Sequence, residues 1–401
     1  MKQFNAIQYI AIDIGNCYGL DKLNYEDRIQ WVKTNLDKLE DLQAQAEEPF
    51  LYYKAVRALR DGMAGLPINH HVALDSASSG LQLMSVMMRD KEGCYLTGLI
   101  DPDNRMDAYT LICDEMNRLM AEDGLEEVFV TRKQAKEAVM CGLYGSVAVP
   151  ERVFGKVLLP YFYKALDNKA SGAMNLLAIL KGSWNSVESS HTWTMPDGHY
   201  VQIPIMQMED KRISIKEINY SPVARMAFNI PKKKGVSNIA NMVHSVDAYV
   251  LRSLVRRCNY DKFVVENFMA ISRAVIYQTT DESLPNVKRY KATKMADLTM
   301  LADITYNNVK YYPKELIQAL RAICESVLIH KPFELIVIHD SFAAHPNNCN
   351  FLRQHYNNIL AELSDSNVVC DILNQLYQDG DFENENESIS ELIRNSNYGI
   401  C

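Results

Sequence analysis

The sequence of 401 residues exceeds the size at which one hydrophobic core stops growing, so two or more lobes are expected. Hydrophobic residues make up 48% and charged residues 23%, which is typical of globular proteins and excludes a disordered chain or a coiled coil. No stretch approaches the roughly 18 consecutive apolar residues of a membrane span. The net charge of −8 argues against a protein coated in DNA, but a local basic groove or a basic partner would still permit nucleic-acid chemistry.

The first predicted elements are helices. Ile29, Val32 and Leu36 recur at helical spacing and predict a helical region over residues 25–60. A further helix is expected over residues 105–121. The nine cysteines contain no Cys-x-x-Cys pair, so a disulfide framework or a zinc ribbon is not indicated.

A short buried strand is predicted at Val72-Ala73-Leu74, followed by Asp75 and the small-residue turn 76–80. The helix after this turn carries Leu81 and Met84 on one side. A carboxylate at the end of a buried strand is suited to Mg²⁺, which takes oxygen ligands and uses one or two carboxylates plus substrate phosphates. The alternative is a helix N-cap, because Asp and Ser both cap well.

Another helix is expected over residues 131–145. At 100° per residue one slanted stripe of this helix carries Arg132, Lys136, Met140 and Tyr144. Gly145 suits the position after the helix end. Two cations and an aromatic ring along one face would suit a nucleoside triphosphate, whereas the alternative is an ordinary amphipathic helix with basic residues outside.

The middle of the chain predicts a turn at residues 193–198 between extended pieces and an exposed loop at 231–235 that contains three lysines. Residues 240–256 are expected to be helical and to carry His244, which alone is more often structural than functional. The apolar run 333–338 is too short for a helix and is expected to be a buried strand.

This last strand ends at His339-Asp340, so a second buried strand delivers a carboxylate at its end. Alone, an aspartate in such a turn is common. Together, Asp75 and Asp340 could meet on one sheet, and two carboxylates bridging two metal ions are what in-line phosphoryl transfer uses.

The order of these motifs and the residues in them resemble those of the single-subunit phage and mitochondrial RNA polymerases. The matching segments are Asp75-Ser76-Ala77-Ser78-Ser79-Gly80-Leu81-Gln82, the stripe Arg132, Lys136 and Tyr144-Gly145, Val243-His244-Ser245-x-Asp247 and His339-Asp340-Ser341-Phe342. Further likeness lies at Asn16-Cys17-x-Gly19-Leu20-Asp21-Lys22, Asp107-Ala108-Tyr109, Pro196-Asp197-Gly198 and the ending Ser396-Asn397-Tyr398-Gly399-Ile400-Cys401. The resemblance spans essentially the whole chain.

This resemblance implies a mixed, helix-rich α/β fold: a right-hand polymerase with palm and fingers but without the thumb and N-terminal domain. Residues 1–91 would form the first part of the palm, and residues 92–243 the fingers, with the nucleotide-binding helix at 131–145 and a promoter-reading loop at 195–230. Residues 244–401 would form the second part of the palm and a C-terminal foot.

The resemblance also implies roles for single residues. Asp75 and Asp340, with the backbone carbonyl of Ser76, would hold two Mg²⁺ ions. Arg132 and Lys136 would bind the triphosphate, and Lys136 and Tyr144 would be catalytic beside the two aspartates. The remaining residues expected to contact the nucleotide or the template are Met140, Gly145, His244, Tyr109 and Gly80.

Two departures from the family pattern weaken phosphate contacts. Glu137 stands where relatives tend to carry a second base, and Ala11 stands where a lysine is often found. Gly80 and Tyr144 favour a ribonucleotide, because related DNA polymerases carry a bulky glutamate and a phenylalanine at these two positions.

The resemblance implies partners as well. Relatives are longer at the N-terminal side, so the chain is expected to be the larger, catalytic subunit of a split enzyme similar to the heterodimeric RNA polymerase II of N4-like phages. Its partners would be a smaller N-terminal polymerase subunit, DNA template, RNA product, NTPs and a single-stranded-DNA-binding recruitment factor, in the cytoplasm of an infected bacterium.

Other hypotheses stay open at the level of sequence. The chain could be a template-dependent DNA polymerase or primase-like enzyme, a non-catalytic scaffold, or a metal-dependent phosphoesterase. Three tracts could touch DNA or remain solvated surface, namely residues 195–230, the lysines 232–234 and Arg256-Arg257.

Overall fold

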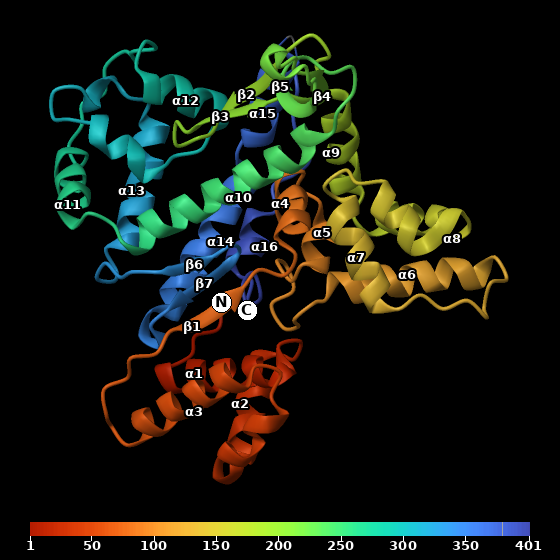
Figure 1. Cartoon of the computed structure of the whole chain (residues 1–401). Helices are drawn as coiled ribbons and strands as arrows, with labels where there is room; N and C mark the ends of the chain where they lie inside the picture. Colours follow the sequence, from red (N-terminus) through yellow and green to blue (C-terminus); the bar gives the residue numbers. More distant parts are fainter. Residues whose placement is uncertain (379) are drawn as a thin grey trace.

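The computed structural model describes residues 1–378 and 380–401 and shows a helix-rich α/β protein with small sheets (Figure 1). The α-helices are α1 (Ala6–Gly15), α2 (Tyr25–Thr34), α3 (Pro49–Met63), α4 (Ser79–Met87), α5 (Lys91–Leu96), α6 (Ala108–Glu122), α7 (Arg132–Gly142), α8 (Ala148–Lys169), α9 (Ser171–Gly182), α10 (Ser237–Cys258), α11 (Lys262–Ile271), α12 (Pro285–Thr293), α13 (Lys314–Val327), α14 (Cys349–Asp365), α15 (Val368–Tyr377) and α16 (Ser390–Arg394). The strands are β1 (Val72–Asp75), β2 (Ser190–Thr194), β3 (Tyr200–Pro204), β4 (Met206–Arg212), β5 (Val223–Asn229), β6 (Ile336–Ile338) and β7 (Ser341–Ala344).

A three-stranded antiparallel sheet lies at the centre of the molecule, with the strand order β1-β7-β6. In this sheet β1 pairs with β7 from the other end of the chain, so that Asp75 lies opposite Ser341. The strands β6 and β7 form a hairpin whose turn is His339-Asp340. The long-range pairing therefore brings the two strand-end aspartates to the same edge of one sheet.

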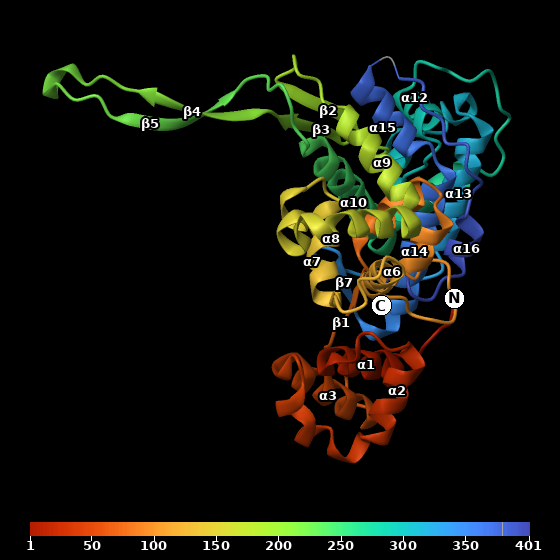
Figure 2. The same cartoon turned by 90° about the vertical axis from the view of Figure 1, so that its right-hand side faces the viewer.

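Helices surround the sheet on several sides (Figure 1). Helices α1 to α3 form an N-terminal lobe below β1, and α6 to α8 project on one side. Helices α10 and α14 lie along the sheet. A two-stranded hairpin of β4 and β5 extends far from the body beyond the β2–β3 pair (Figure 2).

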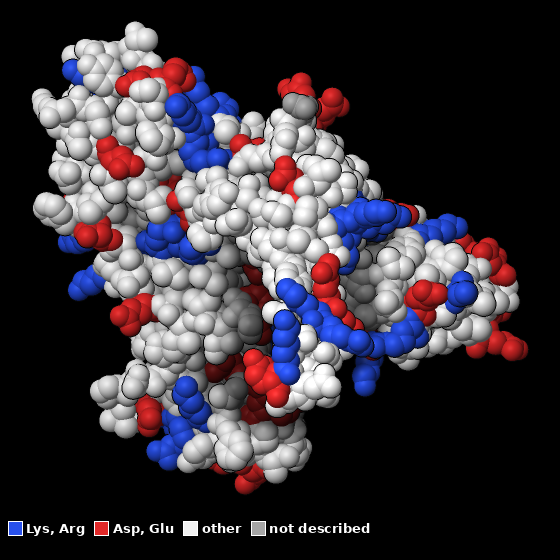
Figure 3. Space-filling model, turned by 45° about the horizontal axis from the view of Figure 1, so that its top comes forward, with Lys and Arg blue, Asp and Glu red and all other residues white. Residues whose placement is uncertain are grey.

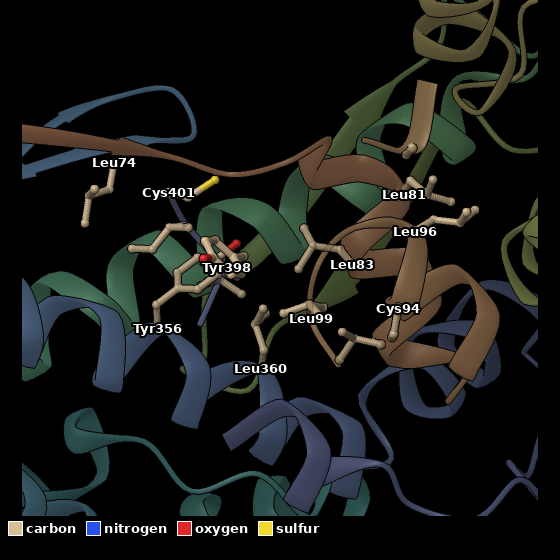
Figure 4. Close-up of a cluster of buried hydrophobic side chains, with 14 of the residues drawn as sticks. Leu74, Leu81, Leu83, Cys94, Leu96, Leu99, Tyr356, Leu360, Tyr398 and Cys401 are labelled. Carbon is tan, nitrogen blue, oxygen red and sulfur yellow. The ribbon is translucent and has the colours of Figure 1, made fainter. Parts of the chain in front are cut away.

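The main core packs around the sheet, α4 and α14, and includes the C-terminal segment (Figure 4). Leu74 and Leu81 are fully buried there, as are Leu360 and Tyr398. A second cluster of buried side chains holds α11 to α13 together around Phe268 and Leu320. Two cores agree with the expectation of more than one lobe.

Most predicted elements are confirmed, with two corrections. The helical region 25–60 is interrupted by short 3-10 turns over residues 36–45, because α2 ends at Thr34 and a new helix begins at Pro49. The strand predicted over 333–338 is shorter, since only residues 336–338 form β6, and it is not buried: Ile336 and Ile338 are exposed because β6 is the edge strand of the sheet.

Arg256-Arg257 is not a solvated or DNA-contacting surface tract. Arg257 is almost fully buried and pairs with Glu362 of α14, and Arg256 bridges Asp197 and Asp297 at 3.1 and 2.9 Å. Paired guanidinium groups in these positions connect α10 to neighbouring elements. The described residues contain no helix that combines the length and apolar character needed to cross a bilayer.

Candidate active site

The two strand-end aspartates meet at one turn. The backbone N–H of Ser76 donates to the carbonyl oxygen of Asp340 at 3.2 Å. Asp75 also exchanges two backbone hydrogen bonds with Cys401, at 3.2 and 2.9 Å. Since β7 and the C-terminal segment both pair with this short stretch, its backbone is fixed from two sides.

The charges at this turn influence one another. Asp75 opens into a cleft, yet the surrounding protein removes enough water to raise the pKa of its carboxyl, and the Asp340 carboxylate raises it further. Asp247 of α10 is affected more strongly: burial and then the charge of Asp340 raise its pKa to about 6. The negative charge of Asp340 thus disfavours ionisation of both Asp75 and Asp247, and a divalent cation bound among these carboxylates would offset that repulsion.

A buried polar network holds the turn after β1. The Ser76 hydroxyl donates to Gln82 Oε1 at 3.0 Å, and the hydroxyl of Tyr356 donates to the same oxygen at 2.6 Å. Gln82 Nε2 in turn donates to the Gly399 carbonyl at 2.9 Å. The Ser76 carbonyl accepts the Ser78 N–H at 3.1 Å, which leaves one of its two lone pairs free for another ligand.

The expected phosphate-binding cations lie on the first turns of α7. Thr131 caps this helix together with Gln134, so the helix begins at Arg132. Arg132 Nε donates to Asp107 Oδ2 at 2.5 Å. Although burial acts to raise the pKa of Asp107, hydrogen bonds from Arg132 and Thr110 hold it below its ordinary value. Arg132 is therefore aimed by a charged partner at the start of α6.

Tyr109 supports both cations. The guanidinium carbon of Arg132 lies 5.6 Å and Nζ of Lys136 5.7 Å from the centre of its ring. A cation over an aromatic face at this distance is attracted to the ring. Arg132 and Lys136 face the same cleft as Asp75 and Ser76, a hollow of about 450 Å³ between the N-terminal lobe, β1 and α7.

The end of α7 meets α10 through two rings. Tyr144 stacks on His244 with their centres 5.0 Å apart and their planes 8° apart. A Cβ at Gly80 would lie 2.5 Å from the Tyr144 hydroxyl oxygen, so a side chain at position 80 would displace that ring. The Tyr144 hydroxyl thus occupies the space that a side chain at position 80 would need. Burial and nearby aspartates raise the pKa of Tyr144 to about 12, so it remains a neutral donor.

Gly145 ends the helical segment as expected. Its φ is +89°, and the N–H groups of Gly145 and Ser146 bond back to Gly142 and Cys141. This pair of bonds is the Schellman arrangement, which favours glycine. A Cβ at Gly145 would also lie 2.6 Å from Ile239 Cδ1 of α10. The glycine permits both the turn and the close packing.

Three further predicted positions lie outside this constellation. Met140 is exposed on α7, one turn from the stacked rings. Glu137 pairs with Arg152 of α8 at 2.6 Å, so its charge is neutralised by a neighbouring helix. Ala11 is buried in α1. Among the described residues, no three His, Cys, Asp or Glu side chains form a ready-made metal cage.

Sequence reasoning gave no role to two residues near the aspartates. Asp247 lies one turn after His244 in α10, and that spacing could have placed it on the same face. Arg105 lines the cleft, and its charge acts to lower the pKa of Asp75. No pattern in the sequence pointed to Arg105. A space-filling view shows acidic side chains deep in the central hollow and Lys and Arg along its rim (Figure 3).

Comparisons with known proteins agree with the motifs. A family model described as DNA-dependent RNA polymerase matches residues 3–154, which include Asp75 and Tyr144 but end before Asp340. A mitochondrial DNA-directed RNA polymerase 1 of Arabidopsis thaliana is 30% identical over 172 residues, covering 35% of this chain and 18% of the relative.

Two more relatives extend the likeness. A probable DNA-directed RNA polymerase of Neurospora crassa is 27% identical over 188 residues, covering 42% of this chain and 20% of its own length. The DNA-directed RNA polymerase of Enterobacteria phage K11 is 24% identical over 368 residues, which are 67% of this chain and 39% of the relative. The chain thus spans about a fifth of the length of the first two relatives, and it is similar to these DNA-directed RNA polymerases over the matched segments.

Proposed function

We propose that this chain is the catalytic part of a DNA-directed RNA polymerase that joins ribonucleotides by template-directed nucleotidyl transfer. In this reaction the 3′-hydroxyl of the RNA attacks the α-phosphorus of an NTP, a new phosphodiester forms and pyrophosphate leaves. The observation that carries the proposal is that Asp75 and Asp340 meet at one sheet edge, and that Arg132 and Lys136 line the cleft into which Asp75 opens. The family matches point to the same reaction.

The residues present suit two Mg²⁺ ions. Asp75, Asp340 and the free lone pair of the Ser76 carbonyl are hard oxygen donors, and the mutual repulsion of the carboxylates is what a cation would relieve. When bound, two such ions would activate the attacking hydroxyl and neutralise the leaving pyrophosphate.

The side chains around the aspartates have distinct tasks in this proposal. Arg132 and Lys136 bind the triphosphate, since both cations face the cleft and are oriented by Asp107 and Tyr109. Tyr144 stacks on the incoming base or on His244, and its neutral hydroxyl donates near the ribose. Gly80 keeps this hydroxyl in place by having no side chain.

The proposal includes a division of the enzyme into palm (1–91), fingers (92–243) and second palm with foot (244–401), although α10 crosses the boundary at 243. It also includes a smaller polymerase subunit as partner, as in the split phage enzymes that the chain resembles. The net charge of −8 is consistent with a partner that carries more of the basic DNA-binding surface. The recruiting factor and the action in an infected bacterial host remain predictions of the resemblance.

The direct test is extension of an RNA primer on a preassembled RNA–DNA scaffold with Mg²⁺, because a scaffold bypasses promoter opening. The chain, alone and with a candidate smaller subunit, is expected to add the templated ribonucleotide. Separate rNTP and dNTP pools decide between an RNA and a DNA polymerase. Extension with dNTPs alone would contradict the proposal, and so would hydrolysis of the scaffold without extension.

Sugar selection gives a sharper test of the Tyr144–Gly80 contact. Tyr144→Phe removes the hydroxyl that lies against Gly80 and is expected to retain RNA extension while accepting dNTPs more readily, by roughly tenfold for one lost hydrogen bond. The readout is the ratio of kcat/KM for a matched rNTP and dNTP. An unchanged ratio would remove Tyr144 from sugar selection.

A further inference from the structure

We propose that the loop 231–235 binds the phosphate backbone of a single nucleic-acid strand, which under the polymerase function proposed above is the template strand. This assignment rests on that function for the identity of the strand, but not for the chemistry of the site. The side chains of Lys232, Lys233 and Lys234 are all exposed. Three adjacent cations on an extended loop match a chain of phosphates better than they match one small anion.

The three lysines are not neutralised by carboxylates. Within residues 1–378 and 380–401 the lysine ion pairs are those of Lys2, Lys169, Lys262 and Lys291, and none involves the loop. The chain as a whole has 50 acidic and 42 basic residues, so its net charge is negative. Three neighbouring lysines without ion pairs are a local positive charge that differs from this net charge. Their mutual repulsion is a cost that a bound phosphate strand removes.

The backbone of the loop is held in place by side chains. Trp184 Nε1 donates to the Lys232 carbonyl at 2.8 Å, and the side-chain amide of Gln207 donates to the Pro231 carbonyl. The Trp184 ring also covers Gly235, where a Cβ would come within 2.3 Å of a ring carbon. A loop that is only solvated surface does not need such anchors. A loop that binds a ligand gains affinity from them, because a loop that is already ordered loses less conformational entropy on association.

The loop borders the turn at the end of α7. Val236 and Ile239 lie against Gly145, since a Cβ there would be 3.6 Å from Val236 Cβ and 2.6 Å from Ile239 Cδ1. In Figure 2 the chain returns from β5 to α10 at the base of the hairpin. The chain that leaves the loop for α10 therefore passes beside the end of α7, the helix end that carries the Tyr144–His244 stack.

These lysines bind a different phosphate group from Arg132 and Lys136. A helix rises about 1.5 Å per residue, so the segment from Arg132 to Gly145 spans about 20 Å. A triphosphate held at the start of α7 does not reach the loop at its far end. Arg132 and Lys136 at the start of α7 therefore bind the incoming nucleotide, and the loop lysines near the end of α7 bind the strand.

The test measures binding of a fluorescein-labelled single-stranded oligodeoxynucleotide to the full chain by anisotropy at several KCl concentrations. The variant Lys232→Ala/Lys233→Ala/Lys234→Ala is expected to bind more weakly. Its slope of log K against log salt should be less steep by about 2, since each phosphate contact on a single strand contributes about 0.7. The matched control removes three exposed lysines in or directly after α12 and α13, namely Lys288, Lys314 and Lys331, and should bind like the wild type. Equal losses in both triple variants would overturn the site.

A second pair of variants keeps all three charges. Gly235→Ala displaces the Trp184 ring, and Trp184→Phe removes the indole N–H that holds the Lys232 carbonyl. Both are expected to weaken binding severalfold while retaining the wild-type melting temperature of the main core. Wild-type affinity in both would contradict a pre-positioned loop. These variants separate a built site from general attraction to positive charge.

The scaffold assay separates this inference from the polymerase proposal. If the wild-type chain extends RNA but the lysine triple variant binds and extends like its control, the loop assignment fails alone. If the wild type shows no extension while the triple variant still loses oligonucleotide binding, the polymerase proposal fails and the nucleic-acid site stands. Scaffolds with and without a single-stranded template overhang identify the bound strand. If the lysine triple variant still loses binding on scaffolds that lack the overhang, the strand at the loop is not the template.

Discussion

The turn after β1 and the hairpin β4–β5 differ in how many bonds fix them to the rest of the molecule. Backbone bonds from β7 and Cys401, and a side-chain network through Gln82, hold the turn that carries Asp75. Among the described residues, the backbone bonds that tie the hairpin to the body lie at its base, where the Ile205 N–H donates to the Ser189 carbonyl at 2.8 Å.

The difference shows in the side chains. Met208 and Tyr220 of the hairpin are exposed, whereas Leu74 beside Asp75 is fully buried. An isolated two-stranded hairpin is marginally stable in water, while a strand paired across the chain and packed on a core is rigid. Chemistry that requires atoms fixed within a fraction of an ångström belongs on the first kind of segment. The hairpin suits contacts that tolerate movement.

The largest effect is expected at the rigid turn. Asp75→Asn and Asp340→Asn keep the size of the side chain but remove a charge from the proposed two-metal site. Each should lower the rate of nucleotide addition roughly a thousandfold or more, because several kcal/mol of transition-state stabilisation are lost. Single-turnover extension on the scaffold measures this. The control is Asp41→Asn, an exposed carboxylate of the N-terminal lobe, and equal rates in all three variants would contradict the assignment.

The effect of the Asp340 charge on Asp247 of α10 is expected to be intermediate in size. Burial and Asp340 raise the pKa of Asp247 to about 6, above the value of about 3.9 for an unfolded chain. The Asp247 carboxyl therefore binds a proton more tightly in the native state than in the unfolded state. As a result, the free energy of unfolding falls as pH rises from about 4 to about 6. Above pH 6 the full penalty applies.

Asp247→Asn should remove that penalty. At pH 7.5 in the absence of divalent metal it is expected to raise the free energy of unfolding by up to about 3 kcal/mol, from two pKa units at about 1.4 kcal/mol each. The gain should vanish near pH 3.5, where the aspartate is protonated in both states. Denaturant unfolding at several pH values measures this, and a gain that is independent of pH would show that Asp247 is not strained by its charge.

The smallest effect is expected in the hairpin. Replacing residues 208–227 by Asn-Gly joins Gln207 and Phe228, which already face each other, through a favourable two-residue turn. The free energy of unfolding should change by no more than about 0.5 kcal/mol, because the deleted segment packs against no core. Scaffold extension should keep the wild-type rate. A large loss of stability or of extension rate would mean that the hairpin contributes to the catalytic centre.

The rigid region was also the more predictable one. The strand at 72–74, the following turn and the helix 131–145 have strong local patterns, and the structure contains all three. The convergence of Asp75 and Asp340 followed from two strands that each end in a carboxylate. The pairing of β1 with β7 involves distant parts of the chain, however, and only the structure gives its register.

Other features depend on packing that no local pattern encodes. The ion pairs of Arg256 with Asp197 and Asp297 join three separate segments of the chain. Because no local pattern shows these partners, the sequence predicted Arg256 to be a surface residue. Arg105 reaches the cleft from an irregular segment after α5. The exposure of Ile338 follows from the position of β6 at the sheet edge, which an apolar run alone does not reveal.

The most direct test of the central claim is to count bound divalent ions at the two aspartates. Mn²⁺ takes the same oxygen ligands as Mg²⁺ and can be counted by electron paramagnetic resonance. The complex contains scaffold, an RNA with a 3′-deoxy end and the matched NTP, so that no reaction occurs. We expect two Mn²⁺ ions per wild-type complex and the loss of at least one in Asp75→Asn and in Asp340→Asn. An unchanged number of bound ions in both variants would contradict the claim.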